Sequence, residues 1–528
     1  MTQSRDESPN TAGLVIIGAG ASGAHTLLSL LAELSSAARR APQPLRICVI
    51  DRDPQFFTGI AYGDRSGSTA LTLSTMHEFL PDEERARFVE WVAARQVLQD
   101  ASIDSAWVQR HLAEITEGRW DQLFIPRRLY GAYLADRART AMLAAQADGV
   151  AEFALISAEV TAVAPSNDGY RVAASARDGR VVQIDAATVV LAIGSPPARR
   201  LAVRDGLTDD LVHDVYDPGL DATVEGLRRR LADLPVDGRE ILVVGGNAAA
   251  LEFVLAGQGI VRDLRARLTV LSPSGRPRHW RRKKTGEIAH LDAVTALSSK
   301  ASAGERVTAA MLYESVRSDL QDAVDSGSDL AATRALFEAI PSFLGFLHDE
   351  DRAALVARYG TAITALLRQD CGDAVDILEA SVATGAVVFE AGRYLACRRE
   401  GRYFRVITTD DRGRQSLLDT RFGAIVGATG FERVSDTRSP LIRHLLQTGI
   451  VDASSSDAGL RVDGRFRAAP GLFVIGPLLA GNAHPNMLIW HAESVRRIMA
   501  IASEAASFIA RELNARAPKD SLSATTNN

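Results

Sequence analysis

The stretch LVIIGAGASG, residues 14–23, decides the fold of this chain. Its four apolar residues are typical of a buried parallel strand, and they lead at once into the pattern GxGxxG and an alanine- and leucine-rich helical segment. Gly18 permits a tight turn, Gly20 lets the backbone approach a pyrophosphate, and Gly23 lets the helix pack close to the strand. The first N–H groups of that helix, near Ser22, and the helix dipole would face the phosphates. The stretch therefore predicts a dinucleotide-binding unit; an ordinary glycine-rich turn is the alternative, and the flanking pattern argues against it.

An acidic residue ends the next predicted strand, residues 46–51. The Asp51 carboxylate can accept hydrogen bonds from both hydroxyls of a ribose and would repel a 2′-phosphate. It therefore favours FAD or NAD over NADP at this first site. Asp51 comes later than the spacing of roughly 20 residues that the fingerprint shows, because a proline-containing loop, residues 35–44, intervenes.

Length and composition limit the class of protein. The 528 residues suffice for two or three domains, and an aliphatic composition with 6% aromatic residues fits α/β architecture. The net charge of −5 does not indicate a protein that binds nucleic acid or a membrane surface. No apolar run reaches transmembrane length and the first dozen residues are polar, so we expect a cytoplasmic protein. The three cysteines are far apart and form neither a metal cluster nor a CxxC pair, which argues against a catalytic disulfide.

A second strand–turn–helix pattern, residues 240–252, repeats the first. Asn247 and Ala250 replace its middle and third glycines, so a pyrophosphate would fit less closely. The strand that follows ends in Ser272 rather than in an acid, and Arg276 begins a run of basic residues. Loss of the carboxylate with gain of serine and arginine admits a 2′-phosphate, which favours NADPH over NADH. A solvated loop is the alternative interpretation of the basic run.

Two further segments carry candidate site residues. Residues 56–63 are punctuated by glycines, which indicates close approach of the backbone to a flat or charged group, or else an ordinary surface loop. Arg127 and Arg128 lie in the first turn of a predicted helix, where a cation gains nothing from the helix dipole. Their placement predicts an anion nearby, with a solvated helix face as the alternative.

Later strands are expected to complete the first sheet. Residues 153–190 read as β-hairpins that lead into a buried strand ending at Gly194. Residues 423–431 and 471–477 are predicted to return to the same sheet, where carboxyl ends of strands bind ligands, and residues 485–513 are predicted to be helical. The expected division is an FAD-binding domain of residues 13–235 and 411–512, an NAD(P)-binding domain of residues 236–284 and 381–410, a helical insertion of residues 285–380, and disordered tails of residues 1–12 and 513–528.

Taken in order, these motifs resemble those of flavoproteins with two dinucleotide-binding domains. More closely, the chain resembles the bacterial FAD/NAD(P)-binding family in which an extended first βαβ unit precedes a Gly-Ile-Ala-Tyr segment. That group is similar to single-component N-hydroxylating flavin monooxygenases, including the aspartate N-oxygenase that forms nitrosuccinate. The resemblance implies an α/β fold with two Rossmann-like domains and covers most of the chain outside the helical insertion. It rests on residues 18–23 with Asp51, 59–62, 191–194, 245–252, 428–431 and 471–477.

The resemblance also implies which residues meet each cofactor. Many relatives have an acid after the last glycine, where this chain has Pro477, so backbone N–H groups and the start of the last helix would take its place. The residues implied for FAD are Gly18, Gly20, Ser22, Gly23, Asp51, Gly59, Tyr62, Gly194, Gly476, Pro477 and Asn486, and those implied for NADPH are Gly245, Asn247, Ala248, Ser272 and Arg276.

The activity implied is an FAD-dependent, NADPH-using monooxygenase that oxygenates a small amine or amino acid with O2 through a flavin hydroperoxide. No catalytic side chain is identified, and Arg127 or Arg128 would pair with a substrate carboxylate. Two alternatives stay open: an FAD oxidoreductase without oxygen insertion, and a flavin-binding sensor or scaffold whose altered second fingerprint no longer binds a nucleotide. Neither a nucleic acid nor a membrane is an expected partner, and the oligomeric state is open. Candidates near the flavin are His484, Asn486, Trp490 and His491.

Overall fold

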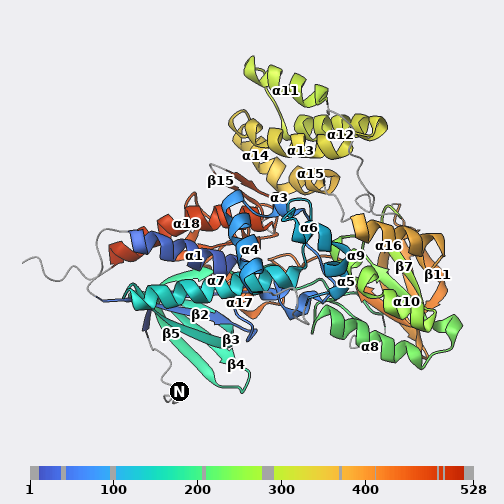
Figure 1. Ribbon diagram of the computed structural model, residues 1–528, viewed down its shortest axis with the longest axis horizontal. Coiled ribbons are helices and arrows are strands. Elements are labelled where there is room, and N and C mark those ends of the chain that lie inside the picture. The colour runs from blue at the N-terminus through green and yellow to red at the C-terminus, as the bar shows by residue number, and fades with distance from the viewer. Residues whose placement is uncertain are drawn as a thin grey trace, which may run out of the picture.

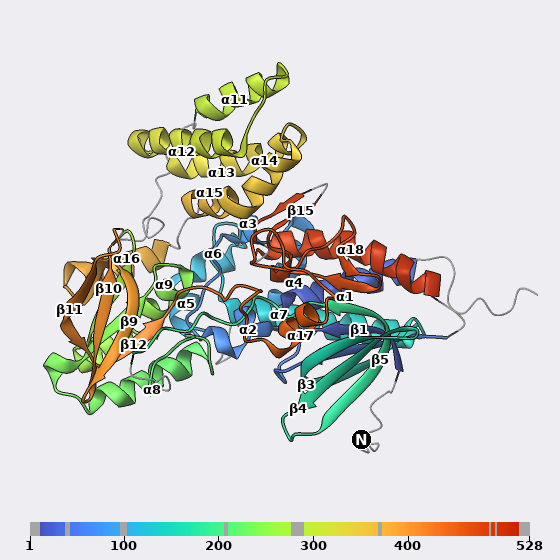
Figure 2. The same ribbon diagram turned by 180° about the vertical axis from the view of Figure 1, so that it is seen from behind.

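Two α/β units lie side by side, and a bundle of helices projects from one side of the molecule (Figures 1 and 2). The predicted α/β fold with two Rossmann-like units is confirmed. The computed structural model describes residues 11–36, 43–95, 103–204, 210–275, 290–367, 372–410, 412–484, 487–491 and 494–516.

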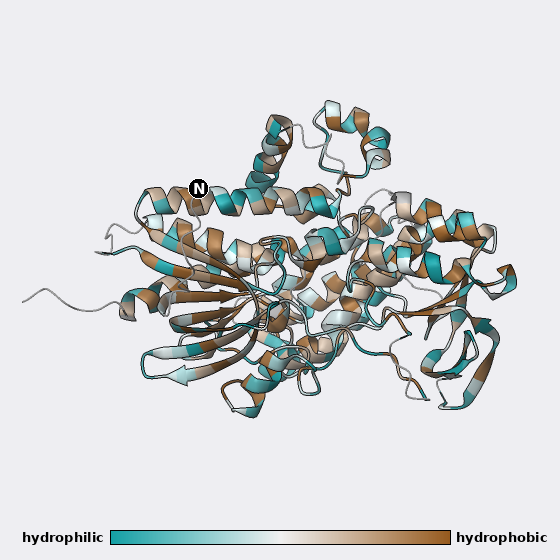
Figure 3. Ribbon diagram, turned by 90° about the horizontal axis from the view of Figure 1, so that it is seen from below, coloured by the Kyte–Doolittle hydropathy of each residue, from teal (hydrophilic) through white to brown (hydrophobic). Residues whose placement is uncertain are grey.

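The first unit is organised around one seven-stranded sheet, and its first strand lies in the middle of the parallel part. The strand order is β1-β2-β3-β4-β5-β14-β13, with β1 also paired in parallel with β5. Leu14, Val15 and Ile16 of β1 have no exposed surface, as the apolar run predicts, and the central strands are hydrophobic along their length (Figure 3). The strands are β1 (Thr11–Ile17), β2 (Leu45–Asp51), β3 (Ala151–Ser166), β4 (Gly169–Ala176), β5 (Val181–Leu191), β13 (Arg467–Ala469) and β14 (Leu472–Val474).

Helices cover this sheet. The helix α1 that follows the fingerprint packs against α18 and α7, and α17 packs against β3. Within the described residues, no helix is long and apolar enough to cross a bilayer. The helices of the unit are α1 (Ala21–Ser36), α2 (Gly59–Tyr62), α3 (Met76–Phe79), α4 (Asp82–Arg95), α5 (Ser105–Arg110), α6 (Leu112–Thr116), α7 (Arg127–Ala147), α17 (Pro440–Gln447) and α18 (Val495–Arg516).

The second unit has a four-stranded parallel sheet in the order β12-β6-β7-β8. Alternate residues of β6 face its two sides: Ile241 and Val243 pack among helices, whereas Leu242 and Val244 pack against the small antiparallel sheet β11-β10-β9. The elements are α8 (Leu220–Ala232), β6 (Glu240–Val244), α9 (Ala248–Ala256), α10 (Gln258–Leu264), β7 (Arg267–Ser272), α16 (Gly372–Ala383), β8 (Val387–Ala391), β9 (Arg393–Glu400), β10 (Tyr403–Thr409), β11 (Gln415–Phe422) and β12 (Ala424–Gly427).

The strand β12 corrects one sequence prediction. Residues 423–431 were expected to return to the first sheet, but β12 pairs in parallel with β6, with Gly427 opposite Val244. A short apolar strand is buried in either parallel sheet, so its pattern does not say which one it joins. Helices α8 and α16 also share the core of the second unit, which therefore extends outside the predicted ranges 236–284 and 381–410.

The projecting bundle has a hydrophobic core of its own, which includes Leu312, Val316, Leu336, Phe343 and Ile363. The bundle lies against a two-stranded hairpin, β15 (Asn482–His484) and β16 (Met487–Ile489), in the C-terminal part of the first unit. The helices are α11 (Asp292–Ser302), α12 (Ala309–Ser326), α13 (Asp329–Ala339), α14 (Asp349–Ala354) and α15 (Gly360–Leu367), with 3-10 and π turns at Ile340–Gly345 and Leu355–Tyr359.

Both ends of the chain are more ordered than predicted. Strand β1 begins at Thr11, which pairs with Asp185 of β5, and α18 continues to Arg516, so parts of the predicted tails 1–12 and 513–528 are regular structure. The predicted helix 485–513 begins only at Val495, because residues 487–489 form β16 instead.

Candidate active site

The first fingerprint forms the predicted turn at the carboxyl end of β1. Gly18 has φ 99°, and a Cβ there would collide with the carbonyl oxygen of Ala192 at the end of β5. A Cβ on Gly23 would collide with the carbonyl oxygen of Gly18. Both positions therefore require glycine, one for the turn and one for the approach of α1 to the strand.

Asp51 lies beside this turn, at the end of β2. Its Oδ2 accepts a hydrogen bond from the N–H of Ala19 at 2.6 Å, and its Oδ1 accepts one from Asp53 at 2.8 Å. Burial raises the pKa of Asp51, while the two backbone donors oppose that shift. Each carboxylate oxygen has a further lone pair, so the side chain can also accept from a ribose. The position fits the ADP half of a dinucleotide.

The segment that begins at Gly59 packs directly on the fingerprint. The N–H of Phe57 donates to the Ala19 carbonyl at 2.6 Å, and a Cβ on Gly20 would lie 3.5 Å from the Gly59 Cα. In the other direction, a Cβ on Gly59 would lie 2.9 Å from the Gly20 Cα. The backbones of Gly20 and Gly59 are thus in direct contact, and a side chain at position 59 would push them apart. The close approach seen here is to the backbone of the fingerprint, and approach to a flat or charged group stays a prediction.

Tyr62 fixes the other side of that segment to α7. Its ring lies 5.0 Å from the ring of Tyr130, edge to face, and a Cβ on Gly131 would collide with its carbonyl oxygen. Tyr62 therefore packs the segment against α7. The backbone of the segment, and not the Tyr62 side chain, lies against the fingerprint.

Two more glycines lie where strands of this sheet end. Gly194 follows β5 with φ 82°, and nothing stands within 4 Å of the position of a Cβ. Gly476 follows β14 with φ 85°, and a Cβ there would collide with Oγ of Ser22. Pro477 opens a short 3-10 turn, and Asn486 lies outside the described residues. The carboxyl ends of β1, β5 and β14 thus meet at one edge, which is where doubly wound sheets bind ligands.

The second fingerprint repeats this construction. Gly245 has φ 116°, and a Cβ there would collide with the carbonyl oxygen of Ala428, just as Gly18 faces Ala192. The Asn247 side chain accepts a hydrogen bond from Ala250 N at 3.2 Å and caps α9, which begins at Ala248. Asparagine thus replaces the middle glycine as a helix N-cap.

Ser272, at the end of β7, fits the ribose side of a second dinucleotide. It is buried, and its Oγ has no hydrogen-bond partner among the described residues. A buried hydroxyl without a partner costs free energy unless a ligand supplies one. Arg276, the other predicted contact to a 2′-phosphate, lies outside the described residues.

The comparisons agree with this geometry. Residues 15–196 match a family model described as FAD-NAD(P)-binding. An uncharacterized protein of Mycobacterium tuberculosis is 30% identical over 522 residues, which cover 95% of this chain and 96% of that protein. The chain belongs to this FAD/NAD(P)-binding family. This match confirms the prediction that FAD and NAD(P) are the cofactors.

Solved structures show the same fold as this flavoprotein. The ornithine N-hydroxylase of Kutzneria sp. 744 has a TM-score of 0.55 at 14% identity, over 95% of this chain and 99% of that chain. The cadaverine monooxygenase DfoA of Erwinia amylovora has a TM-score of 0.55 at 13% identity, over 96% and 95%. The resemblance to N-hydroxylating flavoproteins is thereby confirmed for the fold.

The two arginines expected to meet a substrate carboxylate meet carboxylates of the flavoprotein itself. Arg127 forms an ion pair with Glu252 of α9, and its Nε donates to the Leu71 carbonyl at 2.9 Å. Arg128 forms an ion pair with Asp221 of α8 at 2.9 Å. The predicted anions exist, but they lie in the second unit, so the geometry favours a role between the units. Sequence spacing did not reveal these carboxylates because they are far along the chain.

The histidine and tryptophan candidates divide into two groups. His484 stacks on Phe466 with ring centroids 4.4 Å apart, and its Nε2 lies 3.0 Å from the Gly464 carbonyl, so it packs the C-terminal region. Trp490 donates from Nε1 to Thr364 Oγ1 at 2.8 Å, and His491 Nε2 lies 3.2 Å from the same oxygen. Trp490 and His491 therefore attach the helical bundle to the first unit.

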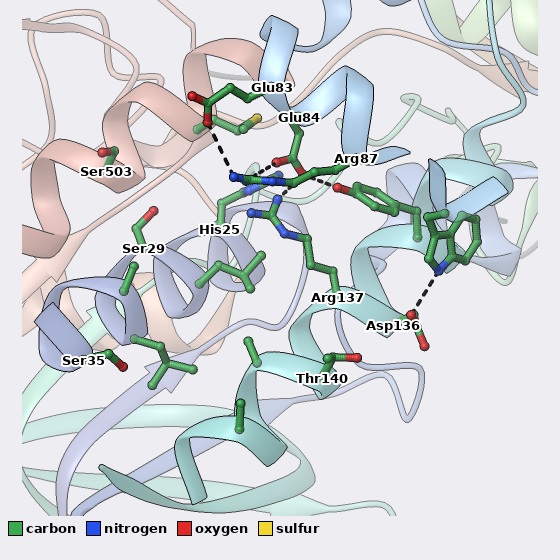
Figure 4. A pocket seen from close by; sticks show the side chains of 18 of the residues that line it. His25, Ser29, Ser35, Glu83, Glu84, Arg87, Asp136, Arg137, Thr140 and Ser503 are labelled. Atoms are coloured by element: carbon green, nitrogen blue, oxygen red, sulfur yellow. Dashed lines mark hydrogen bonds and ion pairs between the residues drawn. The ribbon is translucent and has the colours of Figure 1, made fainter. Parts of the chain in front are cut away.

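A groove of about 1080 Å³ lies elsewhere, between α1, α4, α7 and α18 (Figure 4). Along α1 its lining runs from His25 to Ser35, and neither the glycines of the fingerprint nor Asp51 belongs to it, so it is separate from the dinucleotide site. Inside it, buried Glu84 accepts a hydrogen bond from the Tyr133 hydroxyl at 2.7 Å and pairs with Arg137. Within the described residues, no group of side chains could hold a metal ion.

Proposed function

We propose that this flavoprotein is an FAD-dependent, NADPH-using monooxygenase that acts on a small amine or amino acid with O2. The observation that carries the proposal is the repeated turn, in which Gly18 faces Ala192 and Gly245 faces Ala428 at the carboxyl ends of two parallel sheets. One chain therefore offers two dinucleotide sites. A protein that passes electrons from a nicotinamide to a flavin needs both.

The fold likeness supports the choice of reaction. The Kutzneria ornithine N-hydroxylase was solved with reduced FAD, NADP+ and L-ornithine, and DfoA with FAD. Bound flavin would supply hydride acceptance from NADPH and activation of O2. A cytoplasmic location, inferred from the sequence, is compatible with this use of NADPH.

The residues of this chain have distinct tasks in the proposal. The start of α1 would bind the FAD pyrophosphate through its N–H groups, and Asp51 would hold the adenosine ribose. The segment at Gly59 would lie along the cofactor, because its backbone already lies against Gly20. At the second site the start of α9 would bind the NADPH pyrophosphate, and Ser272 would donate to its ribose phosphate.

Turnover with a panel of amines and amino acids tests the proposal. We expect FAD-loaded protein to oxidise NADPH, with O2 uptake that rises with one class of amine, and a product heavier than that amine by one oxygen atom in mass spectrometry. NADPH oxidation that yields only hydrogen peroxide with every amine would favour an oxidoreductase without oxygen insertion. Absence of NADPH binding in calorimetry would favour the flavin-binding sensor or scaffold.

A further inference from the structure

A buried ion pair joins the two nucleotide-binding units. Arg127 begins α7 in the first unit, and Glu252 lies in α9 of the second. Their side chains are only 11% and 7% exposed. Other ion pairs among the described residues are more exposed, such as Arg128–Asp221 and Arg171–Asp185, and exposed pairs contribute little because water screens them.

Both carboxylate oxygens of Glu252 have a partner within the protein. One pairs with Arg127, and the other accepts the hydroxyl of Tyr216. The Nε of Arg127 donates to the Leu71 carbonyl at 2.9 Å. Burial alone would lower the pKa of Arg127, but Glu252 and Tyr216 together raise it, so the guanidinium stays charged. The pair is thus held by protein groups on both sides and acts as a link between the two units.

Each end of the link leads to one dinucleotide site. Five residues before Glu252, Asn247 caps the same helix and takes the middle position of the second fingerprint. On the other side, α7 carries Gly131, which packs against the carbonyl of Tyr62 and so against the segment that lies on the first fingerprint. Helix α9 therefore leads from Glu252 to the second fingerprint, and α7 leads from Arg127 to the segment that lies on the first fingerprint.

Further contacts between the two units lie beside this ion pair, and their side chains are less buried. We call this line of contacts between the units the seam. Arg128 pairs with Asp221, whose side chain is 45% exposed, and Asp221 also accepts the N–H of Ser68 at 2.9 Å. Arg65 donates from Nε to the Tyr216 carbonyl at 2.8 Å. These contacts close the seam, whereas the buried pair is the one whose disruption leaves an uncompensated charge.

We propose that Arg127 and Glu252 are positioning residues that fix the orientation of the second unit against the first, and thereby hold the nicotinamide of NADPH in register with the flavin. This inference rests on the proposed function, because it requires both nucleotides. The step concerned would transfer a hydride, two electrons with one proton, from NADPH to oxidised FAD, which leaves NADP+ and reduced flavin. Neither residue touches the reacting atoms, so small rotations between the units would act on rate rather than on cofactor binding.

The variant Glu252→Gln keeps the shape of the side chain and removes its charge. We expect the rate constant for anaerobic reduction of the bound flavin by NADPH to fall at least tenfold, while the FAD content and the rate of reduction by dithionite stay unchanged. Dithionite needs no alignment of the units, so it isolates positioning from flavin reactivity. Hydrogen exchange of residues 248–256 should increase in Glu252→Gln without any added nucleotide, which gives a readout independent of turnover.

Two further variants separate positioning from loss of stability. The double variant Arg127→Met/Glu252→Met removes both charges at similar volume, so it should unfold at a temperature close to wild type and still be reduced slowly by NADPH. The control Arg171→Gln breaks an exposed ion pair with Asp185 in the first sheet, and all rates should stay at wild-type values.

Equal loss of the NADPH and dithionite rates in Glu252→Gln, or a wild-type rate with NADPH, would overturn the inference. Restoration of rapid reduction in the double variant would also overturn it, because stability alone would then explain the effect. If NADPH does not reduce the wild-type protein, the proposed function fails. Unchanged hydrogen exchange in α9 would, separately, show that the pair does not fix the units.

Discussion

Gly476 and Ser22 touch across the edge of the first sheet, although most of the chain separates them. A Cβ on Gly476 would collide with the hydroxyl oxygen of Ser22, the second residue of α1. The turn after the last strand of the sheet therefore closes directly on the helix N-terminus that is expected to bind the FAD pyrophosphate. We therefore expect folding of the C-terminal region to complete the FAD site.

The variant Gly476→Ala should lose both stability and flavin. Gly476 has φ 85° and ψ −148°, a backbone region that is essentially confined to glycine and costs alanine about 1–3 kcal/mol, and displacement of Ser22 adds about 1–3 kcal/mol. The control Gly449→Ala also has a positive φ, 69°, but its Cβ would face open space. Urea unfolding and flavin absorbance after gel filtration measure both effects. Equal destabilisation of the two variants would contradict the contact.

The substitution Asp51→Asn should weaken FAD binding about tenfold, or about 1.4 kcal/mol. The carboxylate accepts from two backbone N–H groups, those of Ala19 and Asp53, and an amide can present its oxygen to only one of them. Fluorescence titration of the apoprotein with FAD measures the affinity. The control Asp53→Asn alters the neighbouring carboxylate, which accepts from Gln55 N at 3.0 Å, and should leave FAD affinity within twofold.

Acid should destabilise the protein through His25. Burial, and after it the charge of Arg137, lowers the pKa of His25 from 6.5 to about 3. Since the folded pKa is depressed, the unfolded chain binds the proton first, and stability falls by about 1.4 kcal/mol per pH unit as the pH drops below 6.5 towards 3. Urea unfolding measures the unfolding free energy at pH 6.5 and at pH 5. This range is chosen because few carboxylates titrate in it.

The variant His25→Gln removes this proton-binding difference and should flatten the decline between pH 6.5 and pH 5. It should cost about 1 kcal/mol at pH 8, because the ring nitrogen Nε2 lies 2.8 Å from the Tyr130 hydroxyl. The exposed His348→Gln should leave both the pH 8 stability and the slope unchanged. An unchanged slope in His25→Gln would refute the assignment.

Two adjacent glutamates give a matched test of burial. The Glu84 side chain is 3% exposed and pairs with Arg137, whereas that of Glu83 is 87% exposed. Glu84→Gln leaves a partly buried guanidinium without its charge partner and should cost about 3 kcal/mol of unfolding free energy. Glu83→Gln should change it by less than about 0.5 kcal/mol. Thermal unfolding of both variants measures the difference. Equal shifts of the unfolding temperature in Glu84→Gln and Glu83→Gln would contradict this account.

Local sequence patterns predicted what is local in the structure. Residues 14–23 and 240–252 each form a strand, a turn and a helix, because glycine conformation and apolar runs determine these within a few residues. Asn247 was predicted only as a lost glycine, although an asparagine before an alanine-rich helix is also an N-cap signal. Contacts between residues distant in sequence could not be predicted. Arg127 and Glu252 are 125 residues apart, and the sequence of β12 does not indicate which sheet the strand joins.

Removal of the Ser272 hydroxyl tests whether the second site distinguishes NADPH from NADH. Since Oγ is buried and has no hydrogen-bond partner among the described residues, Ser272→Ala should leave the free protein as stable as wild type or slightly more stable. If the hydroxyl donates to the 2′-phosphate, the same change should weaken NADPH binding about tenfold, or about 1.4 kcal/mol, and leave NADH binding unchanged, because NADH carries no phosphate there. Calorimetric titration with each nucleotide, beside a thermal unfolding curve, gives the comparison. Equal affinity of wild type and Ser272→Ala for NADPH would remove Ser272 from the site, and a loss shared by both nucleotides would place the hydroxyl at the ribose and not at its phosphate.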